Sequence, residues 1–480
     1  MTTVRIHEDE PYGQISPRLY GHFAEHLGRC CYNGLWVGPA SPIPNIEGFR
    51  TDIVEAFQAM RVPLLRWPGG CYADHYHWRD GVGNPSERPV RLGMSCGLQV
   101  RDDNSLGTHE FLRFCELIGA EPYLAGNVGS GSVQELCDWV EYCNAPVQTD
   151  LAQERGRNGR TQPFGVKLWG VGNENWGCGG NYEAESYGLE YRRYAGMLRH
   201  VDPTAELVVC GHDSHWNARI IQTLRNHIGL VDHFSIHRYW IDCGPGVDFT
   251  EEDYYRSVKE ADATEKFVQE TRALLDEVDP KGRVGIALDE WGVWHPEARP
   301  WGPGGKGDET KEYFQAATLR DAVLVAVALE GFHRQCASLS MANLAQIVNV
   351  LHAPIQTSGA QMWLTPTYHV LRMSSAHIGQ QAIRTSVEGS SALPDGSPSV
   401  SATASVGEEG PVLTITNRHF TQPAELQVPN WAAVCTLLSG PSANAENSAG
   451  QPHHVQPKSQ KIGATLELPP FSVAILQSAR

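Results

Sequence analysis

The chain has 480 residues, of which 41% are hydrophobic and 19% are charged, a composition typical of a globular protein with a large core. This length exceeds that of one small domain and fits a barrel with an accessory domain. The formal net charge of −17 argues against a nucleic acid or an anionic membrane as partner, because both attract positive protein surfaces.

The N-terminal residues are polar and soon acidic, with no apolar signal core. No run in the chain approaches the roughly 18 apolar residues of a membrane helix. We therefore expect a cytoplasmic protein. The 12 cysteines are scattered without paired C-x-x-C spacings, so in a reducing compartment we expect free thiols, many of them buried, and disfavour a zinc site.

From about residue 15 to residue 365, short apolar runs alternate with helix-like stretches. The candidate strands are Leu19–Phe23, Val62–Trp67, Pro122–Gly126, Val166–Val171, Glu206–Cys210, His233–Ile236, Val284–Leu288 and Ala337–Met341. The amphipathic segments between them include Glu47–Met60, Thr108–Ile118, Val133–Asn144, Ala184–His200, Tyr255–Val278 and Lys311–Phe332. Eight strands with intervening helices predict an α/β fold, a (β/α)8 barrel over residues 15–365.

After about residue 370 the helical periodicity fades and short alternating runs appear. They are Val412–Thr416, Glu425–Val428, Val434–Leu438, Thr465–Leu468 and Val473–Leu476. Gly, Pro, Ser and Asn punctuate these runs, which predicts a β-sandwich over residues 366–480. Residues 1–14 are expected to join it, because the run Thr3–His7 precedes the first barrel strand. The polar segment Pro441–Lys461 is predicted to be a long surface loop.

Polar side chains follow nearly every predicted barrel strand. They are Glu25, Arg66 and Cys71, Asn127, Asn173 and Glu174, His212, His237 and Tyr239, Glu290, and Asn343 and Gln346. The carboxyl ends of barrel strands carry the catalytic groups of such enzymes. A doubly wound open sheet would also alternate strands and helices, but it would need a phosphate-binding glycine loop. The stretch 302–308 resembles one, yet it lacks Ser or Thr after Lys306 and follows no strand, so we expect a mobile loop near the active face.

Two glutamates stand out because each ends an apolar, β-prone run, in Gly170–Trp176 and in Ile286–Trp291. Two carboxylates at this face can share the acid/base and nucleophilic work on a glycosidic bond. We interpret Glu174 as the general acid/base, with Trp169 and Trp176 supplying a partly apolar setting. A separation of about 5–5.5 Å between the carboxyl groups would indicate retention, and about 6.5–9.5 Å inversion.

Glu290 is interpreted as the nucleophile, which must stay ionised and therefore needs cationic or donor neighbours. Arg66 and Tyr239 are the candidates. Asp289 competes for the role, but on a regular strand it should point to the opposite face. The competing interpretation of each carboxylate is a structural one: a solvated loop glutamate at 174, or an arginine-paired one at 290.

Aromatic residues are plentiful near the predicted active face and favour carbohydrate, whose rings stack on aromatic faces, although any single one is more often core. They are Trp67, Tyr72, Trp78, Trp176, Tyr239, Trp240, Trp291, Trp294 and Trp301. Several histidines could instead be metal ligands: His22, His26, His75, His77, His212 and His237. No pair of them has the helical H-E-x-x-H arrangement, so a barrel metallohydrolase or metal-dependent isomerase stays a minority interpretation.

Taken together, the motifs resemble those of glycoside hydrolase family 51, mainly α-L-arabinofuranosidases, over essentially the whole chain. The matching stretches are Gly21–Cys30, Leu65–Cys71, Tyr76–Gly83, Gly172–Glu174, Ser235–Tyr239, Leu288–Trp291 and Met341–Val350. No single stretch is specific, but their combination is.

The resemblance implies roles residue by residue. Glu174 looks like the family's acid/base and Glu290 like its nucleophile; Glu25, Asn173 and Gln346 look like contacts to the furanose hydroxyls, and Tyr239 like the partner of the nucleophile. Cys71 stands where many relatives carry asparagine, and its thiol offers only a weak hydrogen bond. We expect Arg66, His237, Trp294 and Trp301 to support the site. The resemblance also implies a C-terminal β-sandwich, no cofactor or metal requirement, and commonly a hexamer.

The expected reaction is hydrolysis, with retention by double displacement, of terminal, non-reducing α-L-arabinofuranosyl groups from oligosaccharides of arabinoxylan or arabinan. Two alternatives stay open: the same chemistry on another glycan, as an endoglucanase or xylosidase, and a non-catalytic carbohydrate-binding barrel. Retention of both glutamates with Asn173 and Tyr239 argues against the second. The expected aglycone-side residues are Trp78, Met94–Arg101 and His295–Asp308.

Overall fold

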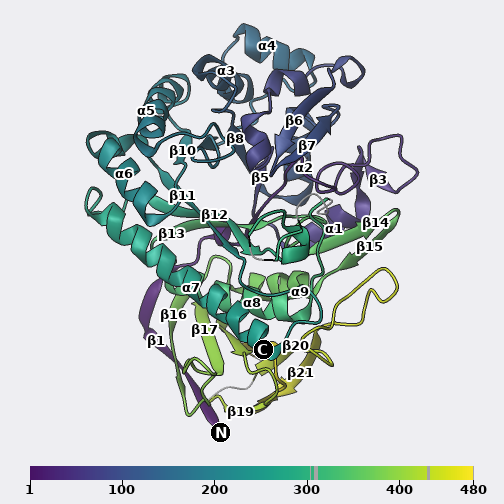
Figure 1. Cartoon of the computed structure of the whole chain (residues 1–480), viewed down its shortest axis with the longest axis vertical. Coiled ribbons are helices and arrows are strands. Elements are labelled where there is room, and N and C mark those ends of the chain that lie inside the picture. Colours follow the sequence, from purple (N-terminus) through teal and green to yellow (C-terminus); the bar gives the residue numbers. More distant parts are fainter. Residues whose placement is uncertain (303, 307–311, 430–432, 479–480) are drawn as a thin grey trace.

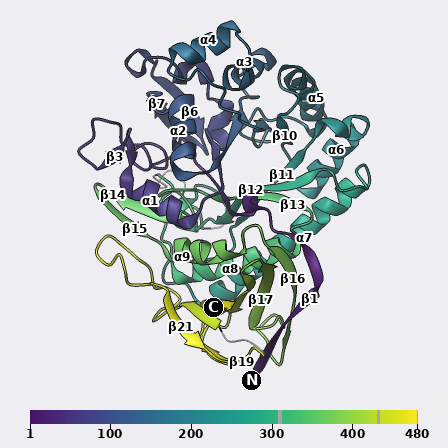
Figure 2. The ribbon, with the colours of Figure 1, turned by 180° about the vertical axis from the view of Figure 1, so that it is seen from behind.

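The computed structural model describes residues 1–302, 304–306, 312–429 and 433–478, and it places a barrel on top of a smaller sheet domain (Figures 1 and 2). The barrel is closed by eight hydrogen-bonded strands in the order β2, β5, β8, β9, β10, β11, β12 and β13. All neighbours run parallel. The bounds are Gly21–Phe23, Leu64–Trp67, Glu121–Gly126, Leu168–Val171, Glu206–Val209, His233–Trp240, Gly285–Val293 and Leu339–Ala345. Each lies on or overlaps a predicted run, so the (β/α)8 prediction is confirmed.

Helices surround the barrel, and local signals explain where several of them begin. They are α1 (Thr51–Met60), α2 (Thr108–Ile118), α3 (Val133–Asn144), α4 (Asp150–Arg157), α5 (Ala184–Val201), α6 (Ser214–Leu224), α7 (Glu251–Asp276), α8 (Leu319–Arg334) and α9 (Pro366–Ser374). A capping box of Thr250 and Asp253 starts α7 four residues earlier than predicted. A second box, of Thr318 and Asp321, starts α8 eight residues later than predicted. Helices α4, α6 and α9 were not predicted.

Apolar side chains cover both faces of the barrel strands. Six side chains, one from each of six strands, fill the barrel interior: Leu64, Tyr123, Leu168, Val208, Ala287 and Met341. The alternate residues of these strands, such as Trp169 and Leu207, pack outward in the large core under the helices. Burial of both strand faces explains why the sequence shows continuous apolar runs rather than alternation.

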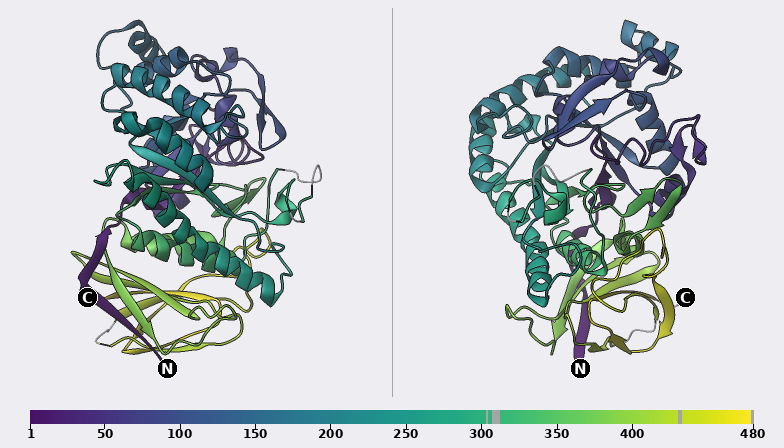
Figure 3. Two further views of the ribbon diagram at one scale, coloured as in Figure 1. Left: turned by 60° about the vertical axis from the view of Figure 1, so that its left-hand side comes forward. Right: turned by 45° about the vertical axis from the view of Figure 1, so that its right-hand side comes forward.

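The sheet domain below the barrel joins nine strands into one mostly antiparallel sheet (Figure 3). Its strands are β1 (Thr2–Gln14), β16 (Gln381–Glu388), β17 (Val400–Gly407), β18 (Gly410–Asn417), β19 (Ala424–Gln427), β20 (Ala433–Leu438), β21 (Lys458–Ile462), β22 (Thr465–Leu468) and β23 (Ser472–Ser478). Strand β1 pairs with β16, as predicted for the N-terminal run. Leu466 and Leu476, from opposite parts of the strand order, share one apolar cluster, so the sheet curls over its own core.

Helices α8 and α9 lie between the barrel and the sheet domain (Figure 1). Two buried histidines tie the parts together. His333 of α8 contacts Tyr20 at 2.8 Å and Thr403 of β17 at 3.2 Å. His377 contacts Ser405 at 2.7 Å and Thr414 at 2.8 Å. Burial lowers the pKa of both imidazoles, that of His377 to about 3, so both are neutral near pH 7.

Two expectations need correction. The segment 441–461 is not loop throughout, because β21 begins at Lys458 and buried Asn447 binds the backbone of Val455. The cysteines are not all free, since Cys71 and Cys178 form a disulfide, although nine of the other ten are buried as expected. The loop 302–308 is described only at 302 and 304–306. Within the described residues, no helix has the length and apolar character needed to cross a bilayer.

Candidate active site

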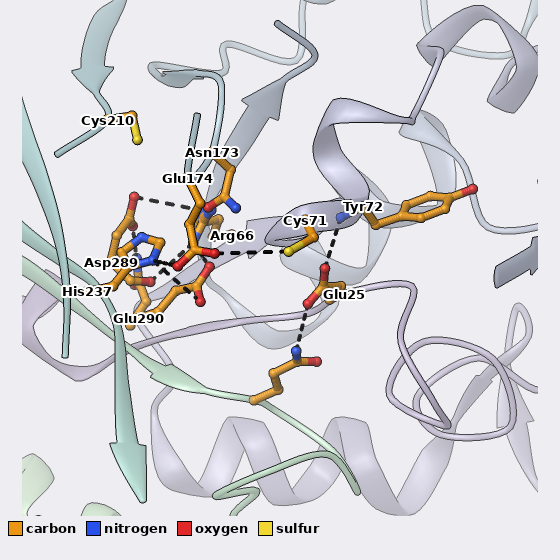
Figure 4. Close-up of polar contacts among 12 residues, drawn as sticks. Glu25, Arg66, Cys71, Tyr72, Asn173, Glu174, Cys210, His237, Asp289 and Glu290 are labelled. Carbon is orange, nitrogen blue, oxygen red and sulfur yellow. Dashed lines mark hydrogen bonds and ion pairs between the residues drawn. The ribbon is translucent and has the colours of Figure 1, made fainter. Parts of the chain in front are cut away.

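Glu174 and Glu290 meet at the carboxyl ends of β9 and β12 (Figure 4). One carboxylate oxygen of each lies within 4.8 Å of the other, with Nδ1 of His237 inside the same radius. The side chain of Glu174 is 18% exposed and that of Glu290 is 6% exposed. One acid is therefore open to solvent while its partner is almost enclosed.

A tight turn after β9 aims Glu174 at the site. Gly172 has φ +85°, and a side chain there would collide with Asn175. Glu174 itself has φ +43°, a left-handed conformation that is uncommon outside glycine and collects at functional sites. Buried Asp74 accepts a hydrogen bond of 3.2 Å from the Asn173 backbone N–H and two more from Val128 and Gly129, which anchors the turn.

Glu290 is held by two donors, both predicted from sequence. Arg66 donates to Oε1 at 3.1 Å, and the Tyr239 hydroxyl donates to Oε2 at 2.6 Å. Burial raises the pKa of Glu290, and the neighbouring His237, Arg66 and Tyr239 oppose that rise. These contacts stabilise the ionised form that a nucleophile needs.

Asp289 does not point away from the site, contrary to the prediction. The pairing of β12 with β11 skips Asp289, passing from Leu288 to Glu290, so the regular alternation of the strand is interrupted. Asp289 faces the barrel interior, where it accepts hydrogen bonds from Tyr123 at 2.8 Å and Asn343 at 2.7 Å. Both oxygens are thereby engaged, which leaves Glu290 as the available carboxylate.

His237 bridges the two glutamates. Its Nδ1 donates to Oε1 of Glu174 at 2.9 Å and lies 3.6 Å from Oε2 of Glu290. Burial alone would lower the pKa of His237, but the charges of Glu290 and Glu174 outweigh it and raise the pKa. A partly cationic imidazole between the carboxylates reduces their mutual repulsion.

Glu25 supplies a third buried carboxyl group opposite Glu290. It accepts hydrogen bonds from the Tyr72 backbone at 3.0 Å, Ser95 at 2.7 Å and Gln346 at 2.9 Å. Burial and the charge of Glu290 raise the pKa of Glu25 to about 7. Gly70 lies between the two acids, because a Cβ there would stand 2.8 Å from Glu290 and 3.4 Å from Glu25.

Two polar atoms of the predicted substrate contacts have no hydrogen-bond partner among the described residues. They are Nδ2 of Asn173 and Oε1 of Gln346, both buried. The other end of each amide is engaged, Asn173 Oδ1 by Arg66 and Gln346 Nε2 by Glu25. Buried polar groups are normally satisfied, so an unpaired donor and an unpaired acceptor beside the glutamates fit a polyhydroxylated ligand.

Aromatic rings line one side of the site, but fewer than predicted. Trp294 contacts Tyr239 at 5.0 Å and Trp301 at 5.1 Å between ring centroids, and Trp301 is 48% exposed. Trp176 stacks on His212 at 3.8 Å. Trp169 instead packs outward against Trp139 of α3, so it does not form part of the surroundings of Glu174.

The structure thus gathers nine predicted residues around the two glutamates: Glu25, Arg66, Cys71, Asn173, Glu174, His237, Tyr239, Glu290 and Gln346. Cys71 has no S–H to donate in its disulfide, so its expected hydrogen bond does not form in this state. Asn127 binds Tyr76 and Ser130 instead, and Asn343 serves Asp289.

Two contributors were missed, Asp74 and Cys178, whereas Ser95 lies within the predicted aglycone-side segment Met94–Arg101 but binds Glu25. Ser95 sits near the tip of the hairpin β6–β7 (Arg91–Ser95 and Leu98–Asp102). The turn of this hairpin consists of Cys96 and Gly97, which both have positive φ. A residue followed by Gly between two alternating runs is a sequence signal for such a two-residue hairpin turn. Asp74 and Cys178 carry no comparable signal.

Comparisons with known proteins agree along the chain. The family model described as "Alpha-L-arabinofuranosidase 1 domain" matches residues 56–261, and "Alpha-L-arabinofuranosidase C-terminal domain" matches residues 289–472. An "Intracellular exo-alpha-L-arabinofuranosidase" of Bacteroides ovatus is 37% identical, covering 99% of this chain and 95% of that protein. "Alpha-L-arabinofuranosidase C" of Emericella nidulans is 32% identical over 93% and 91% of the two chains.

Solved structures give the same result. The family 51 arabinofuranosidase of Xanthomonas axonopodis pv. citri superimposes with a TM-score of 0.91 at 34% identity, covering 100% of this chain and 99% of that one. The α-L-arabinofuranosidase of Thermotoga maritima, solved with arabinose, gives 0.87 at 30% identity and covers 99% of each chain. A family 44 xyloglucanase of Paenibacillus polymyxa, at 11% identity and a TM-score of 0.62, shares the fold alone. The chain therefore belongs to glycoside hydrolase family 51, the α-L-arabinofuranosidase family.

Proposed function

We propose that this chain is a retaining exo-acting α-L-arabinofuranosidase that removes terminal α-L-arabinofuranosyl groups from arabinoxylan- or arabinan-type oligosaccharides. The observation that carries the proposal is the pair of carboxylates within 4.8 Å, bridged by His237. This limit on the distance between two of their oxygens supports the closely spaced carboxyl groups of a retaining enzyme, roughly 5–5.5 Å apart, over the roughly 6.5–9.5 Å of an inverting one.

In the first step, a carboxylate oxygen of Glu290 attacks the anomeric carbon of the sugar. Glu174 gives its proton to the glycosidic oxygen, which leaves with the aglycone, and a glycosyl ester of Glu290 forms. Arg66 and Tyr239 hold the nucleophile ionised and oriented through their bonds of 3.1 and 2.6 Å. Glu174, the more exposed of the two acids, faces the side by which the leaving group and later water must pass.

In the second step, Glu174 takes a proton from water, and the resulting hydroxide attacks the anomeric carbon of the ester. Glu290 leaves as carboxylate, so two inversions give net retention. Glu25, Asn173 and Gln346 hold the furanose hydroxyls, since they bring an acid with a pKa of about 7, a free amide donor and a free amide acceptor to the same space. Trp294 and Trp301 extend the site toward the aglycone.

The test is a panel of aryl glycosides. We expect hydrolysis of an aryl α-L-arabinofuranoside, and little turnover of the matching β-D-xyloside or of β-glucans. Glu290→Ala, purified alongside, should lose essentially all of this activity while keeping its melting temperature, which excludes a contaminating enzyme. Preferred turnover of the xyloside or a β-glucan would overturn the specificity, and inactivity on every glycoside would favour a binding function.

We further propose a cytoplasmic location, in line with the relative named as intracellular. We also propose a homo-oligomeric assembly, with a hexamer expected, and analytical ultracentrifugation of the purified protein would test it. The net charge of −17 supports the proposal that neither nucleic acid nor an anionic membrane is a partner.

A further inference from the structure

Two sulfur atoms lie beside one oxygen of Glu174, and a third sulfur lies beside one of these two. Cys71 lies after β5, Cys96 lies at the tip of the hairpin β6–β7, and Cys178 lies after β9. Oε2 of Glu174 is 4.0 Å from the Cys71 sulfur and 3.7 Å from the Cys178 sulfur. The Cys96 sulfur is 3.9 Å from that of Cys71. Figure 4 shows the Cys71 sulfur turned toward the Glu174 carboxylate.

These spacings are close to the edges of a tetrahedral metal site. Zn–S bonds of about 2.3 Å and Zn–O bonds of about 2.1 Å give S···O edges of roughly 3.6 Å and S···S edges of roughly 3.8 Å. Sulfur atoms of Cys71 and Cys178 and an oxygen of Glu174 all lie within 4.8 Å of one another. The Cys71–Cys178 pair is too close, because these two sulfurs are joined in a disulfide. Opening that bond would let them separate to the length of an edge.

We propose that reduction of the Cys71–Cys178 disulfide creates an inhibitory site for a thiophilic divalent cation such as Zn²⁺ or Cd²⁺. The ligands are the two thiolates and Oε2 of Glu174. Thiolates select such soft d¹⁰ cations over Mg²⁺ or Ca²⁺. The proposal is distinct from a structural zinc site, because the cation binds the acid/base of the proposed mechanism.

The chemistry balances with either of two reductants. A phosphine supplies two electrons, takes its oxygen from water and ends as the phosphine oxide, while the same water supplies the two protons of the new thiols. A dithiol supplies both electrons and both protons and ends as its own disulfide. Cation binding then releases the thiol protons to solvent. A metal-bound Glu174 carboxylate can neither carry a proton to the leaving oxygen nor accept one from water, so turnover stops.

The site is reachable from solvent. Cys178 is exposed, and Cys96 is partly exposed, whereas the other nine free cysteines of the described chain are buried. A cation added to the reduced protein therefore meets these sulfurs first. Each protein can be compared with its own rate without the cation, so sensitivity to the cation can be separated from activity.

The experiment compares reduced and oxidised protein with Zn²⁺ in a phosphine reductant, which avoids chelation by a dithiol. A site with a Kd of about 1 µM is roughly 90% occupied at about 10 µM Zn²⁺, so the reduced enzyme should lose about tenfold in rate. A chelator should restore the rate, and disulfide-oxidised enzyme should be insensitive. Cd²⁺ should give a thiolate charge-transfer absorption in the ultraviolet, a readout that needs no substrate.

Two variants make the test specific. Each is scored by the ratio of its rates without and with Zn²⁺, so basal activity cancels. Cys178→Ala should lose the sensitivity and most of the Cd²⁺ band, while Cys137→Ala, in α3 away from the site, should keep both. Equal inhibition of Cys178→Ala and wild type, or no inhibition and no Cd²⁺ band in reduced wild type, would overturn the proposal. A Cd²⁺ band in a protein inactive on arabinofuranosides would uphold the metal site and count against the proposed function alone.

Discussion

His237 and Glu174 are joined by a hydrogen bond of 2.9 Å from Nδ1 to Oε1, and the same nitrogen lies 3.6 Å from Glu290. One imidazole therefore serves both carboxylates of the proposed mechanism. Because it contacts groups rather than substrate, His237 is a positioning residue. His237 keeps the carboxyl group of Glu174 turned toward Glu290, although the two carboxylates would otherwise repel each other.

Replacing His237 should slow turnover without greatly changing substrate binding. Loss of a hydrogen bond to a charged group costs about 1.5–3 kcal/mol, so we expect kcat of His237→Gln to fall roughly 10- to 150-fold with KM nearly unchanged. His212→Gln is the matched control on the same face, since His212 stacks on Trp176 and contacts neither glutamate. An equal loss in both variants would show that the face tolerates no substitution and would remove the special role of His237.

Removal of the acid/base should depend on the leaving group. Glu174→Ala should lose much more activity on alkyl or oligosaccharide substrates than on an activated aryl arabinofuranoside, because a good leaving group departs without a proton. Azide should restore the rate on the activated substrate, since the small anion can occupy the vacated space and attack the glycosyl ester. Glu183→Ala, an exposed glutamate farther along the same loop, should behave as wild type. Equal loss on both substrates, without azide rescue, would contradict the assignment.

Gly70 should be required for substrate to enter between the acids. The added methyl group of Gly70→Ala would stand 2.8 Å from Oε1 of Glu290, so we expect KM to rise at least about tenfold by steric exclusion. Gly196→Ala in α5 has open space around its Cβ and should leave KM unchanged, while stabilising the helix by roughly 0.5–1 kcal/mol. An unaltered KM in Gly70→Ala would place the sugar elsewhere.

Acid should weaken the junction between the barrel and the sheet domain. His377 has a pKa of about 3 in the fold and about 6.5 when unfolded, so below pH 6.5 the unfolded chain binds the extra proton and stability falls with pH. Between pH 7 and pH 5 this loss is about 2 kcal/mol for His377. In urea unfolding, His377→Gln should therefore lose less unfolding free energy than wild type between pH 7 and pH 5, by that amount. The variant His200→Gln, at an exposed position, should lose as much as wild type. Identical pH dependence in all three proteins would exclude this linkage.

The barrel could be predicted because its strands are buried on both faces, which leaves eight apolar runs with polar residues at one end. Two of the missed helices, α4 and α9, have only 8 and 9 residues, although Thr365 and Pro366 form a helix-start signal that would have found α9. The orientation of Asp289 was wrong because strand alternation assumes a regular pleat, and the interruption in β12 is set by pairing with its neighbours. The Cys71–Cys178 bond joins residues 107 positions apart, a proximity that only the closed barrel creates.

The most direct test of the mechanism is the anomer of the first sugar released. An aryl α-L-arabinofuranoside is hydrolysed in the NMR tube, and the anomeric proton is followed before mutarotation equalises the two forms. Retention through a Glu290 ester predicts that α-L-arabinofuranose appears first and the β anomer later. First release of the β anomer would mean a single displacement by water and would contradict the roles proposed for Glu174 and Glu290.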